Sequence, residues 1–318
     1  MTTPNPRIGY VLVVAAALMF GVNAGFSRIP IEAGLDIATY TTVRITGAFF
    51  VFLVAAAALR PSALKLPDPA TLVPILMLGL FGVALLQWTY NAAVVRLPLG
   101  IALLLEYLAP VLVVLWVRFA RREQVHPRMW PAIGLALMGL GLVGEVWKGL
   151  TLDRVGVLAA LASGTLFAMY FLLGERITAT GSTRSDPLQT MVWAFGAAAI
   201  FMNLLHPAWN ASALGNDASM LGNLGDTTIP AWLAMTYVVV VGTVLPFFLY
   251  LASMQHLPSS VASVVAMLEP VIAVFVGWLW FAELLSAVQA LGVVVVLTGI
   301  ILAQTARLVP ADELPPPV

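Results

Sequence analysis

One stretch of this chain occurs twice, at a constant spacing. Residues 90–111 read YNAAVVRLPLGIALLLEYLAPV and residues 250–271 read YLASMQHLPSSVASVVAMLEPV, an offset of 160 residues (from 90 to 250). The register continues without a gap, and its matched pairs include Tyr90/Tyr250, Pro98/Pro258, Pro110/Pro270, Glu123/Glu283 and Gly139/Gly299. Shared apolar composition does not explain a repeat in which Pro, Tyr and Glu also recur. In a membrane chain, internal repeats are typical of transporters, many of which bind substrate at the seam between the copies.

The chain is too apolar for a water-soluble domain. Of its 318 residues, 61% are hydrophobic and 9% are charged, and the mean hydropathy is +0.99. Soluble domains carry about 25% charged residues. We therefore expect a lipid bilayer to surround most of the chain. The formal net charge of zero and the lack of a basic run with interleaved aromatic residues argue against a nucleic-acid partner.

The sequence predicts neither a cofactor nor a metal site. Cysteine is absent, which excludes disulfides, thiolate nucleophiles and cysteine-based metal sites. The histidines fall near the ends of predicted membrane spans, where a solvated or interfacial side chain is the usual role. No G-x-x-x-x-G-K-[ST], H-E-x-x-H or G-x-S-x-G pattern occurs. We therefore expect a protein that is not an enzyme, with an intramembrane enzyme or a non-transporting membrane scaffold as the alternatives.

Long apolar runs predict ten transmembrane helices. A helix needs about 20 apolar residues to cross the hydrocarbon core. The segments that fit are 8–28, 37–59, 70–94, 99–118, 129–147, 155–175, 188–206, 231–253, 259–281 and 286–306. The first run is rather long for a signal peptide and many spans follow it, so we interpret it as an uncleaved first span.

The distribution of basic residues predicts the orientation. If the N-terminus is cytoplasmic, the inside loops carry most of the Lys and Arg, above all in RFARREQVHPR at 118–128. The polar loop 207–230 has Asp but no Lys or Arg, which suits the outside. We therefore expect a multi-pass protein of the cell (plasma or inner) membrane with both termini cytoplasmic. Residues 307–318 are Pro-rich and are expected to form a disordered cytoplasmic tail.

The span count gives the repeat a direction. Each half contains five spans, and an odd number means that the second half enters the membrane from the opposite side. We therefore predict an all-α membrane protein of ten transmembrane helices, built as a 5+5 inverted-topology repeat. Its first half is residues 8–147 and its second half is residues 155–306.

The two copies resemble a known family. Ten spans arranged as five plus five, with Pro in spans four and nine, resemble the drug/metabolite transporter (DMT) superfamily, and the EamA family most closely. The segments that carry the resemblance are PLGIALLLEYLAPVLVVLWVRFARRE, PSSVASVVAMLEPVIAVFVGWLWFAE and, in span one, LMFGVNAGFSR. The Glu-Tyr-Leu-Ala-Pro at 106–110 is similar to amino-acid exporters of the threonine/homoserine type, and other members export aromatic amino acids or drugs. The resemblance implies a small-molecule exporter.

Two carboxylates inside apolar spans are the main candidate substrate residues. Glu106 and Glu269 lie within apolar spans. Placing an acidic side chain at the membrane centre costs about 2.5–3.5 kcal/mol, so such side chains usually face a cavity or a partner. Pro110 removes the N–H that would bond the carbonyl of Glu106, and we expect helix kinks at Pro110, Pro246 and Pro270. Each acid either meets a substrate ammonium or takes a proton, or it bonds neighbouring helices and holds the kink.

Further polar and aromatic side chains in the spans are candidates for the same cavity. They are Asn23, Gln87, Tyr90, Asn91, Tyr107, Ser163, Tyr170, Phe247, Tyr250 and Ser263. The alternative for each is a helix–helix hydrogen bond or an interfacial anchor. Arg44 is expected to reach the outer interface or to pair with Asp36.

These observations favour a secondary transporter that exports small metabolites or amino acids by alternating access. We expect spans one, three, four, six, eight and nine to enclose a central cavity between the two repeats, and the other spans to be scaffold. The expected partners are a small-molecule substrate (an amino acid or a cationic or amphipathic metabolite) and the lipid bilayer. For the oligomeric state, the sequence is compatible with a monomer and with a homodimer.

Overall fold

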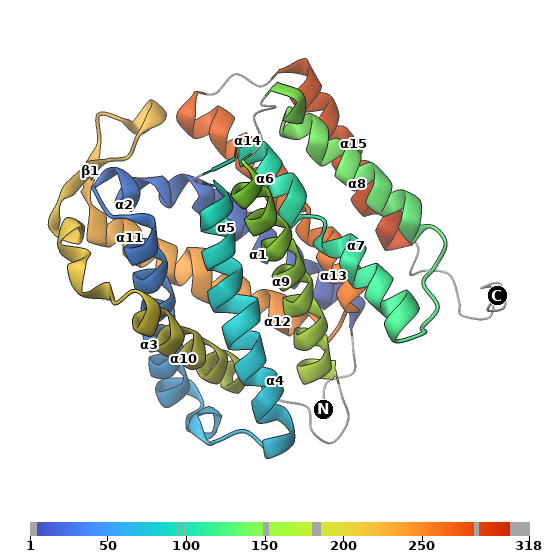
Figure 1. The fold of residues 1–318 in the computed structure, drawn as a ribbon, viewed down its shortest axis with the longest axis horizontal. Coiled ribbons are helices and arrows are strands. Elements are labelled where there is room, and N and C mark those ends of the chain that lie inside the picture. Colours follow the sequence, from blue (N-terminus) through green and yellow to red (C-terminus); the bar gives the residue numbers. More distant parts are fainter. Residues whose placement is uncertain are drawn as a thin grey trace.

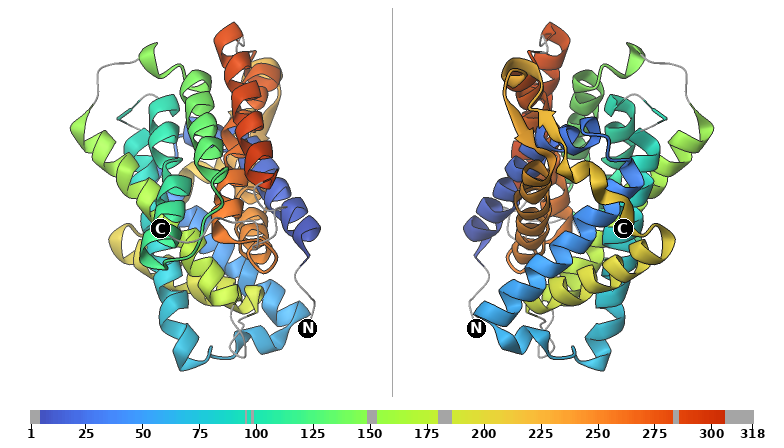
Figure 2. Two further views of the ribbon diagram at one scale, coloured as in Figure 1. Left: turned by 90° about the vertical axis from the view of Figure 1, so that its right-hand side faces the viewer. Right: turned by 90° about the vertical axis from the view of Figure 1, so that its left-hand side faces the viewer.

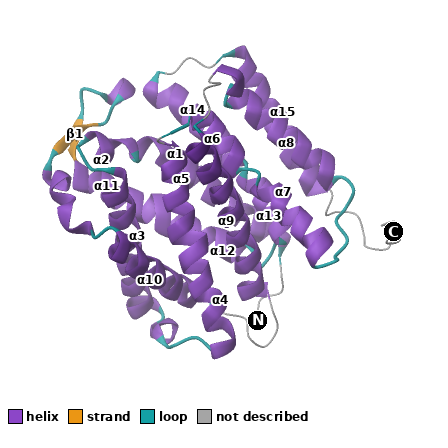
Figure 3. Cartoon of the chain, in the orientation of Figure 1, coloured by secondary structure: helices purple, strands orange, loops and turns teal. Residues whose placement is uncertain are grey.

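The computed structural model describes residues 5–94, 96–97, 99–148, 153–179, 186–282 and 286–305. These residues form a helical bundle with one small hairpin (Figures 1 and 3). The hairpin pairs β1 (Asp217–Ser219) antiparallel with β2 (Thr228–Pro230). Pro98, Glu283 and the expected tail 307–318 lie outside the described residues.

Eight helical segments are long and apolar enough to cross a membrane, judged by length and composition. They are Pro6–Glu32, Ile37–Leu59, Pro69–Val94, Ile101–Ala120, Arg154–Thr178, Pro187–Leu205, Ala231–Ser253 and Ser259–Phe281. The fifth and tenth predicted spans are shorter apolar helices, over Met129–Val143 and Ala287–Ala303. At 1.5 Å per residue, a 15-residue helix is about 22 Å long, short of the roughly 30 Å hydrocarbon core.

The helices of the N-terminal part follow the predicted spans, with several breaks. Their bounds are α1 (Pro6–Phe26), α2 (Arg28–Glu32), α3 (Ile37–Leu59), α4 (Pro69–Gly79), α5 (Leu86–Val94), α6 (Leu99–Glu106), α7 (Ala109–Leu115) and α8 (Met129–Val143). A π-helical turn over Leu80–Leu85 joins α4 to α5. A second π-helical turn, over Trp116–Ala120, extends α7.

The helices of the C-terminal part are arranged in a similar order. They are α9 (Arg154–Ala179), α10 (Pro187–Leu205), α11 (Ala231–Val239), α12 (Leu245–Ser253), α13 (Ser259–Ala266), α14 (Leu268–Phe281) and α15 (Ala287–Thr305). A π-helical turn over Val240–Val244 joins α11 to α12. Short 3-10 helices cover Pro61–Leu64, Val146–Lys148, Ala208–Gly215 and Gly222–Leu224.

Two interruptions divide the helices that carry the candidate acids. α6 ends at Glu106 and α7 begins at Ala109, with Pro110 in its first turn. α13 ends at Ala266 and α14 begins at Leu268, with Pro270 in its first turn. α9 covers the first break closely, because a Cβ on Gly164 would lie 2.9 Å from the carbonyl oxygen of Glu106. Carbonyls freed at such breaks are tolerated in a membrane where protein covers them.

Contacts between the helix ends define two faces of the bundle. On the amino-terminal face, the Asn5 N–H donates to His256 Nδ1 (3.1 Å), and the side chain of Gln189 donates to the Lys65 carbonyl (2.8 Å). On the opposite face, which we call the hairpin face, Trp280 donates to the Met220 carbonyl (2.9 Å). Figure 2 shows the hairpin near one end of the molecule and the start of α1 farther toward the other end. The helices run between these two faces.

Two long helices, α1 and α9, each cross a different group of helices. α1 packs against α12, α13 and α14, whereas α9 packs against α5, α6 and α7. α3 packs on α10 and α8 packs on α15. The α8–α15 contact is backbone-close, since a Cβ on Gly139 would lie 2.6 Å from the Val296 nitrogen. The space between α1, α3, α5, α6, α9, α12 and α14 holds the candidate site.

Candidate functional site

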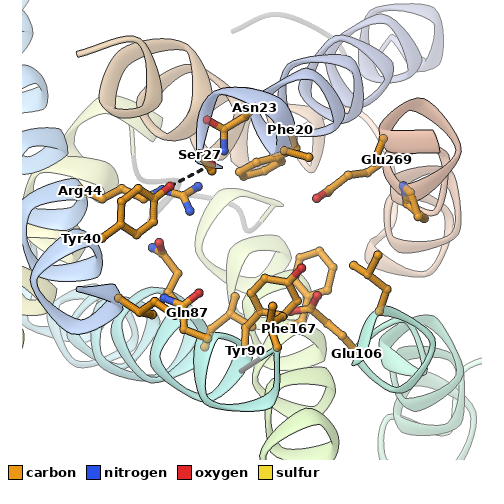
Figure 4. Close-up of a pocket in the computed structure, with 18 of the residues that line it drawn as sticks. Phe20, Asn23, Ser27, Tyr40, Arg44, Gln87, Tyr90, Glu106, Phe167 and Glu269 are labelled. Atoms are coloured by element: carbon orange, nitrogen blue, oxygen red, sulfur yellow. Dashed lines mark hydrogen bonds between the residues drawn. The ribbon is translucent and has the colours of Figure 1, made fainter. Parts of the chain in front are cut away.

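A cavity of about 300 Å³ lies in the middle of the bundle. Its rim includes the exposed residues Arg28 and Ile31 of α2, on the hairpin face. Its deeper part is lined by Phe247 and Tyr250 of α12 and by Glu269 of α14. Figure 4 shows lining residues from helices far apart in the sequence, among them Phe20, Gln87 and Glu269, around one space. The volume is at the lower end of the range for small-molecule sites.

Most of the candidates from the sequence line this cavity. They are Asn23, Gln87, Tyr90, Asn91, Glu106, Tyr107, Phe247, Tyr250 and Glu269. Ser163, Tyr170 and Ser263 do not line it. The Ser163 hydroxyl instead donates to Glu106 Oε1 (2.7 Å), and the Tyr170 hydroxyl donates to the Phe247 carbonyl (2.7 Å). Ser263 donates to the Ser260 carbonyl (3.2 Å).

The two acids approach the cavity from different helices. Glu106 is the last residue of α6, and Glu269 lies in the first turn of α14. Figure 4 shows both carboxyl groups pointing into the same space. Ser163 holds Glu106 from α9, and the Tyr107 hydroxyl bonds the Glu269 carboxylate. The N-terminal end of α14 also favours negative charge at Glu269.

Arg44 lies on the other side of the cavity, where the sequence did not place it. Its Nε donates to Thr243 Oγ1 (2.6 Å) and its Nη2 donates to the Gly242 carbonyl (2.8 Å). The expected pairing with Asp36 is wrong, because the π-helical turn between α11 and α12 presents acceptors directly to α3. The third guanidinium nitrogen, Nη1, has no hydrogen-bond partner among the described residues.

The expectation that span two is only scaffold also needs correction. Ile37, Tyr40 and Arg44 of α3 all line the cavity. The Tyr40 hydroxyl donates to Ser27 Oγ (2.9 Å), which ties α3 to the end of α1. Tyr40 and Arg44 are four residues apart and share one helix face, so a polar stripe in span two was a usable signal.

Hydrogen bonds between helices fix part of the polar wall. The Asn91 side chain donates to Thr41 Oγ1, whose hydroxyl donates to the Ile37 carbonyl (2.7 Å). This arrangement joins α5 to α3 beside the cavity. Ser27, Tyr40 and Phe167 also line the cavity, although this role was not predicted for them from the sequence.

Aromatic rings form the apolar part of the wall. Phe20 meets Phe247 edge to face, with ring centroids 5.3 Å apart, and lies 5.6 Å from Tyr250. Tyr107 meets Phe167 edge to face at 5.9 Å. These contacts join α1 to α12 and the α6–α7 break to α9. Edge-to-face contacts of this kind stabilise a fixed ring arrangement by about 0.5–1.5 kcal/mol each.

Several buried polar atoms of the wall have no partner in the described part of the chain. They are Asn23 Oδ1, Gln87 Oε1 and Nε2, and Tyr250 Oη. Their residues are 5%, 7% and 0% exposed. Buried polar groups in folded proteins are otherwise nearly always hydrogen-bonded.

The amino-terminal face is closed by a contrasting group of side chains. Glu175 of α9 forms an ion pair with Arg121, which follows the π-helical turn after α7. Glu175 Oε1 accepts the Ser259 backbone N–H (2.9 Å), and Oε2 accepts the Ser259 hydroxyl (3.0 Å). Ser259 is the first residue of α13, so this carboxylate also caps that helix. We call Arg121, Glu175 and Ser259 the Glu175 cluster.

The charge layout limits what the cavity can bind. Arg44 supplies a cation on one side, and Glu106 and Glu269 supply two acids on the other (Figure 4). A small molecule with an anionic and a cationic group fits this arrangement better than a molecule of one charge. Among the described residues, no three His, Asp or Glu side chains lie close enough together to hold a metal ion.

Comparison with known proteins agrees with this architecture. The EamA-like transporter family model matches the chain twice, over residues 7–144 and 154–305. An uncharacterised transporter of Archaeoglobus fulgidus is 28% identical over 301 residues, 93% of this chain and 96% of its own length. The threonine/homoserine exporter RhtA of Escherichia coli is 26% identical over 289 residues, 89% of this chain and 87% of its own length.

A solved crystal structure with 20% sequence identity has a TM-score of 0.75 to this chain and covers 94% of it and 97% of its own chain, which shows a shared fold. The family match spans nearly all of the sequence, and the relatives named above carry the names of a transporter and an exporter. The protein is thus a multi-pass membrane protein of the transporter class. It belongs to the EamA-like transporter family.

Proposed function

We propose that this protein is a secondary transporter that exports a small zwitterionic metabolite of the amino-acid class. The observation that carries the proposal is the cavity with Arg44 on one side and Glu106 and Glu269 on the other. An α-carboxylate would bind at Arg44 and an α-ammonium at the acids. Charge-assisted hydrogen bonds of this kind are about twice as strong as neutral ones. The family relationship to a threonine/homoserine exporter supports the substrate class.

The chain consists, in this proposal, of two five-span halves of opposite orientation. The double family match supports this division. So do the helix contacts, because α1 packs against the C-terminal α12, α13 and α14 while α9 packs against the N-terminal α5, α6 and α7. A pseudo-two-fold axis in the membrane plane produces such an exchange of partners. The shorter α8 and α15 are the fifth helix of each half.

Transport proceeds by alternating access in this proposal. Both termini are cytoplasmic, so the hairpin face is external and the present conformation opens outward. The cavity rim at Arg28 and Ile31 supports an external opening, and the Glu175 cluster supports closure on the cytoplasmic side. Export requires the opposite conformation, in which the cluster separates, the cavity loads from the cytoplasm and the outer rim closes.

Proteoliposomes test the proposed function. Purified protein is reconstituted into vesicles preloaded with unlabelled threonine, and uptake of external radiolabelled threonine by exchange is followed. We expect exchange that is saturable and is absent from protein-free vesicles. Parallel measurements with a cationic analogue lacking the carboxylate test the zwitterion requirement. The proposal is wrong if neither threonine nor any other zwitterionic amino acid exchanges above the protein-free background.

A further inference from the structure

Of the three wall residues with unpaired polar atoms, Gln87 and Asn23 lie away from the two acids. Gln87 of α5 contributes both ends of its amide, and Asn23 of α1 contributes Oδ1, which lies against Gly242. Both residues line the cavity and are more than nine-tenths buried. Figure 4 shows Asn23 and Gln87 on facing walls, at the end of the cavity that also holds Arg44 and away from Glu106 and Glu269.

These atoms are costly to leave unpaired. They have essentially no exposed surface, so in this conformation neither a described residue nor solvent bonds them, and a ligand in the cavity reaches them only when the Gln87 side chain turns toward it. A primary amide always presents both a donor and an acceptor, whichever way it is turned. Its natural complement is a group that also donates and accepts, such as a hydroxyl or a carboxamide. An apolar group placed against it would leave both amide atoms unpaired.

We infer that Gln87, supported by Asn23, is a specificity-determining residue that selects substrates whose side chain carries an uncharged hydrogen-bonding group. The inference rests on the proposed function, because it concerns the same cavity. Arg44 and the two acids hold the charges common to all amino acids, so they do not distinguish one side chain from another. The Gln87 amide makes that distinction. A site built to bond a substrate hydroxyl strongly rejects the analogue that lacks it.

Threonine and valine provide a matched test, because they differ by a hydroxyl against a methyl group of similar size. In the proteoliposome exchange assay we expect wild-type protein to prefer threonine by about tenfold or more in kcat/KM. Gln87→Leu replaces the amide with a branched apolar side chain that is one atom shorter. We expect this variant to lose most of its threonine exchange and to bring the threonine-to-valine ratio to about one or below.

Two further measurements separate selection from loss of folding. Gln87→Leu should keep or raise the melting temperature of the ligand-free protein, because it removes an unpaired buried amide. Threonine should raise the melting temperature of wild-type protein and no longer raise that of the variant. If Gln87→Leu does not fold, the unbranched Gln87→Met has the same expected ratio.

Thr190 supplies the control. Its hydroxyl is also buried and unpaired among the described residues, but it lies in α10 and does not line the cavity. Thr190→Val should leave the threonine-to-valine ratio unchanged. A wild-type ratio that persists in both Gln87 variants would overturn this inference and leave the proposed function standing. A wild-type protein that exchanges no zwitterionic amino acid above the protein-free background would overturn both.

Discussion

The cavity wall and the Glu175 cluster differ in how completely their buried polar groups are paired. In the Glu175 cluster, both carboxylate oxygens have partners, which come from α13 and from the segment after α7. In the cavity wall, Gln87 and Asn23 present atoms that no described residue bonds. In the proposed cytoplasmic gate, the groups of the cluster satisfy one another, which stabilises the closed state. A binding site keeps groups unpaired for a ligand, at a cost to the stability of the empty protein.

The largest effect is expected from removing the charge of Glu106. Glu106→Gln keeps an acceptor for the Ser163 hydroxyl, so the break between α6 and α7 should stay intact. It removes the carboxylate that would meet the substrate ammonium. We expect amino-acid exchange to fall about a hundredfold, as for loss of one partner of a buried charge pair. The measurement is initial-rate exchange in proteoliposomes.

Glu32→Gln is the matched control for Glu106. Glu32 is an exposed acid on α2 that does not line the cavity. Its exchange rate should stay within about twofold of wild type, as for an exposed charge. Equal rates in wild type and Glu106→Gln would show that the carboxylate only holds the helix break.

A smaller effect, about tenfold, is expected from Arg44. Arg44→Gln removes the cation that would bind the substrate carboxylate, while the amide can still bond Thr243 and the Gly242 carbonyl. We expect KM for threonine to rise about tenfold. Wild type should prefer threonine over threoninamide, which lacks the carboxylate, and the variant should not. A variant that keeps this preference would place carboxylate recognition elsewhere.

Breaking the Glu175 cluster should change the gate and leave the cavity intact. The chain contains no cysteine, so a single Ala273→Cys in the cavity wall reports accessibility without background. In Glu175→Ala, labelling of this cysteine by a membrane-impermeant maleimide from the amino-terminal face should accelerate several-fold. The physical reason is that about 1–3 kcal/mol of partly exposed ion pairing and capping is lost.

Glu175→Gln makes the comparison stricter. A glutamine retains an acceptor for Ser259 but loses the ion pair with Arg121, so its labelling rate should fall between wild type and Glu175→Ala. If labelling from the amino-terminal face is the same in all three proteins, the cluster is not the cytoplasmic gate.

The smallest effect is expected at Asp36, outside both regions. Asp36 caps α3, accepting the N–H groups of Ala38 and Thr39 at 3.0 Å. Slight burial acts to raise the pKa of this carboxyl. The net shift is nevertheless downward, because the carboxylate accepts hydrogen bonds from the Thr39 side chain, the Thr39 backbone and the Ala38 backbone and also lies near the charge of His206. Asp36→Ala should destabilise the protein by about 0.5–1 kcal/mol at neutral pH.

The pH dependence at Asp36 has a definite sign. Because the pKa in the folded protein lies below the unfolded value of about 3.9, the stabilisation is fully present above pH 4 and is lost as pH falls through the folded pKa. Melting temperatures of wild type and Asp36→Ala should therefore differ at pH 7 and converge at strongly acidic pH. Asp36→Asn, which keeps a capping oxygen but loses the charge, should lie between wild type and Asp36→Ala at pH 7.

The sequence identified much of the cavity because its signals were local. Glu106 and Glu269 stand out inside apolar spans, and Gln87 with Asn91 share one helix face, so their direction follows from helix geometry alone. Arg44 was misplaced because its partners lie on a π-helical turn near residue 242, and nothing in the sequence predicts that turn. Ser163 was assigned to the wall, whereas it binds Glu106, because such pairing depends on how α9 crosses α6.

The fold followed the sequence to a similar extent. Long apolar runs predicted the helices, but the fifth run, 129–147, contains a helix that ends at Val143. The Glu175 cluster was missed altogether, because Arg121, Glu175 and Ser259 belong to loops and helix ends that only tertiary packing brings together. Distances between helix ends depend on crossing angles, and hydrophobic periodicity carries no information about those angles.

The most direct test of the account is an experimental structure determined with a saturating concentration of the amino acid that the protein exchanges. The account predicts one bound molecule in the cavity, with its carboxylate at Arg44 Nη1, its ammonium between Glu106 and Glu269, and its side-chain polar group at Gln87. A ligand bound outside this cavity, or with its ammonium toward Arg44, would contradict it.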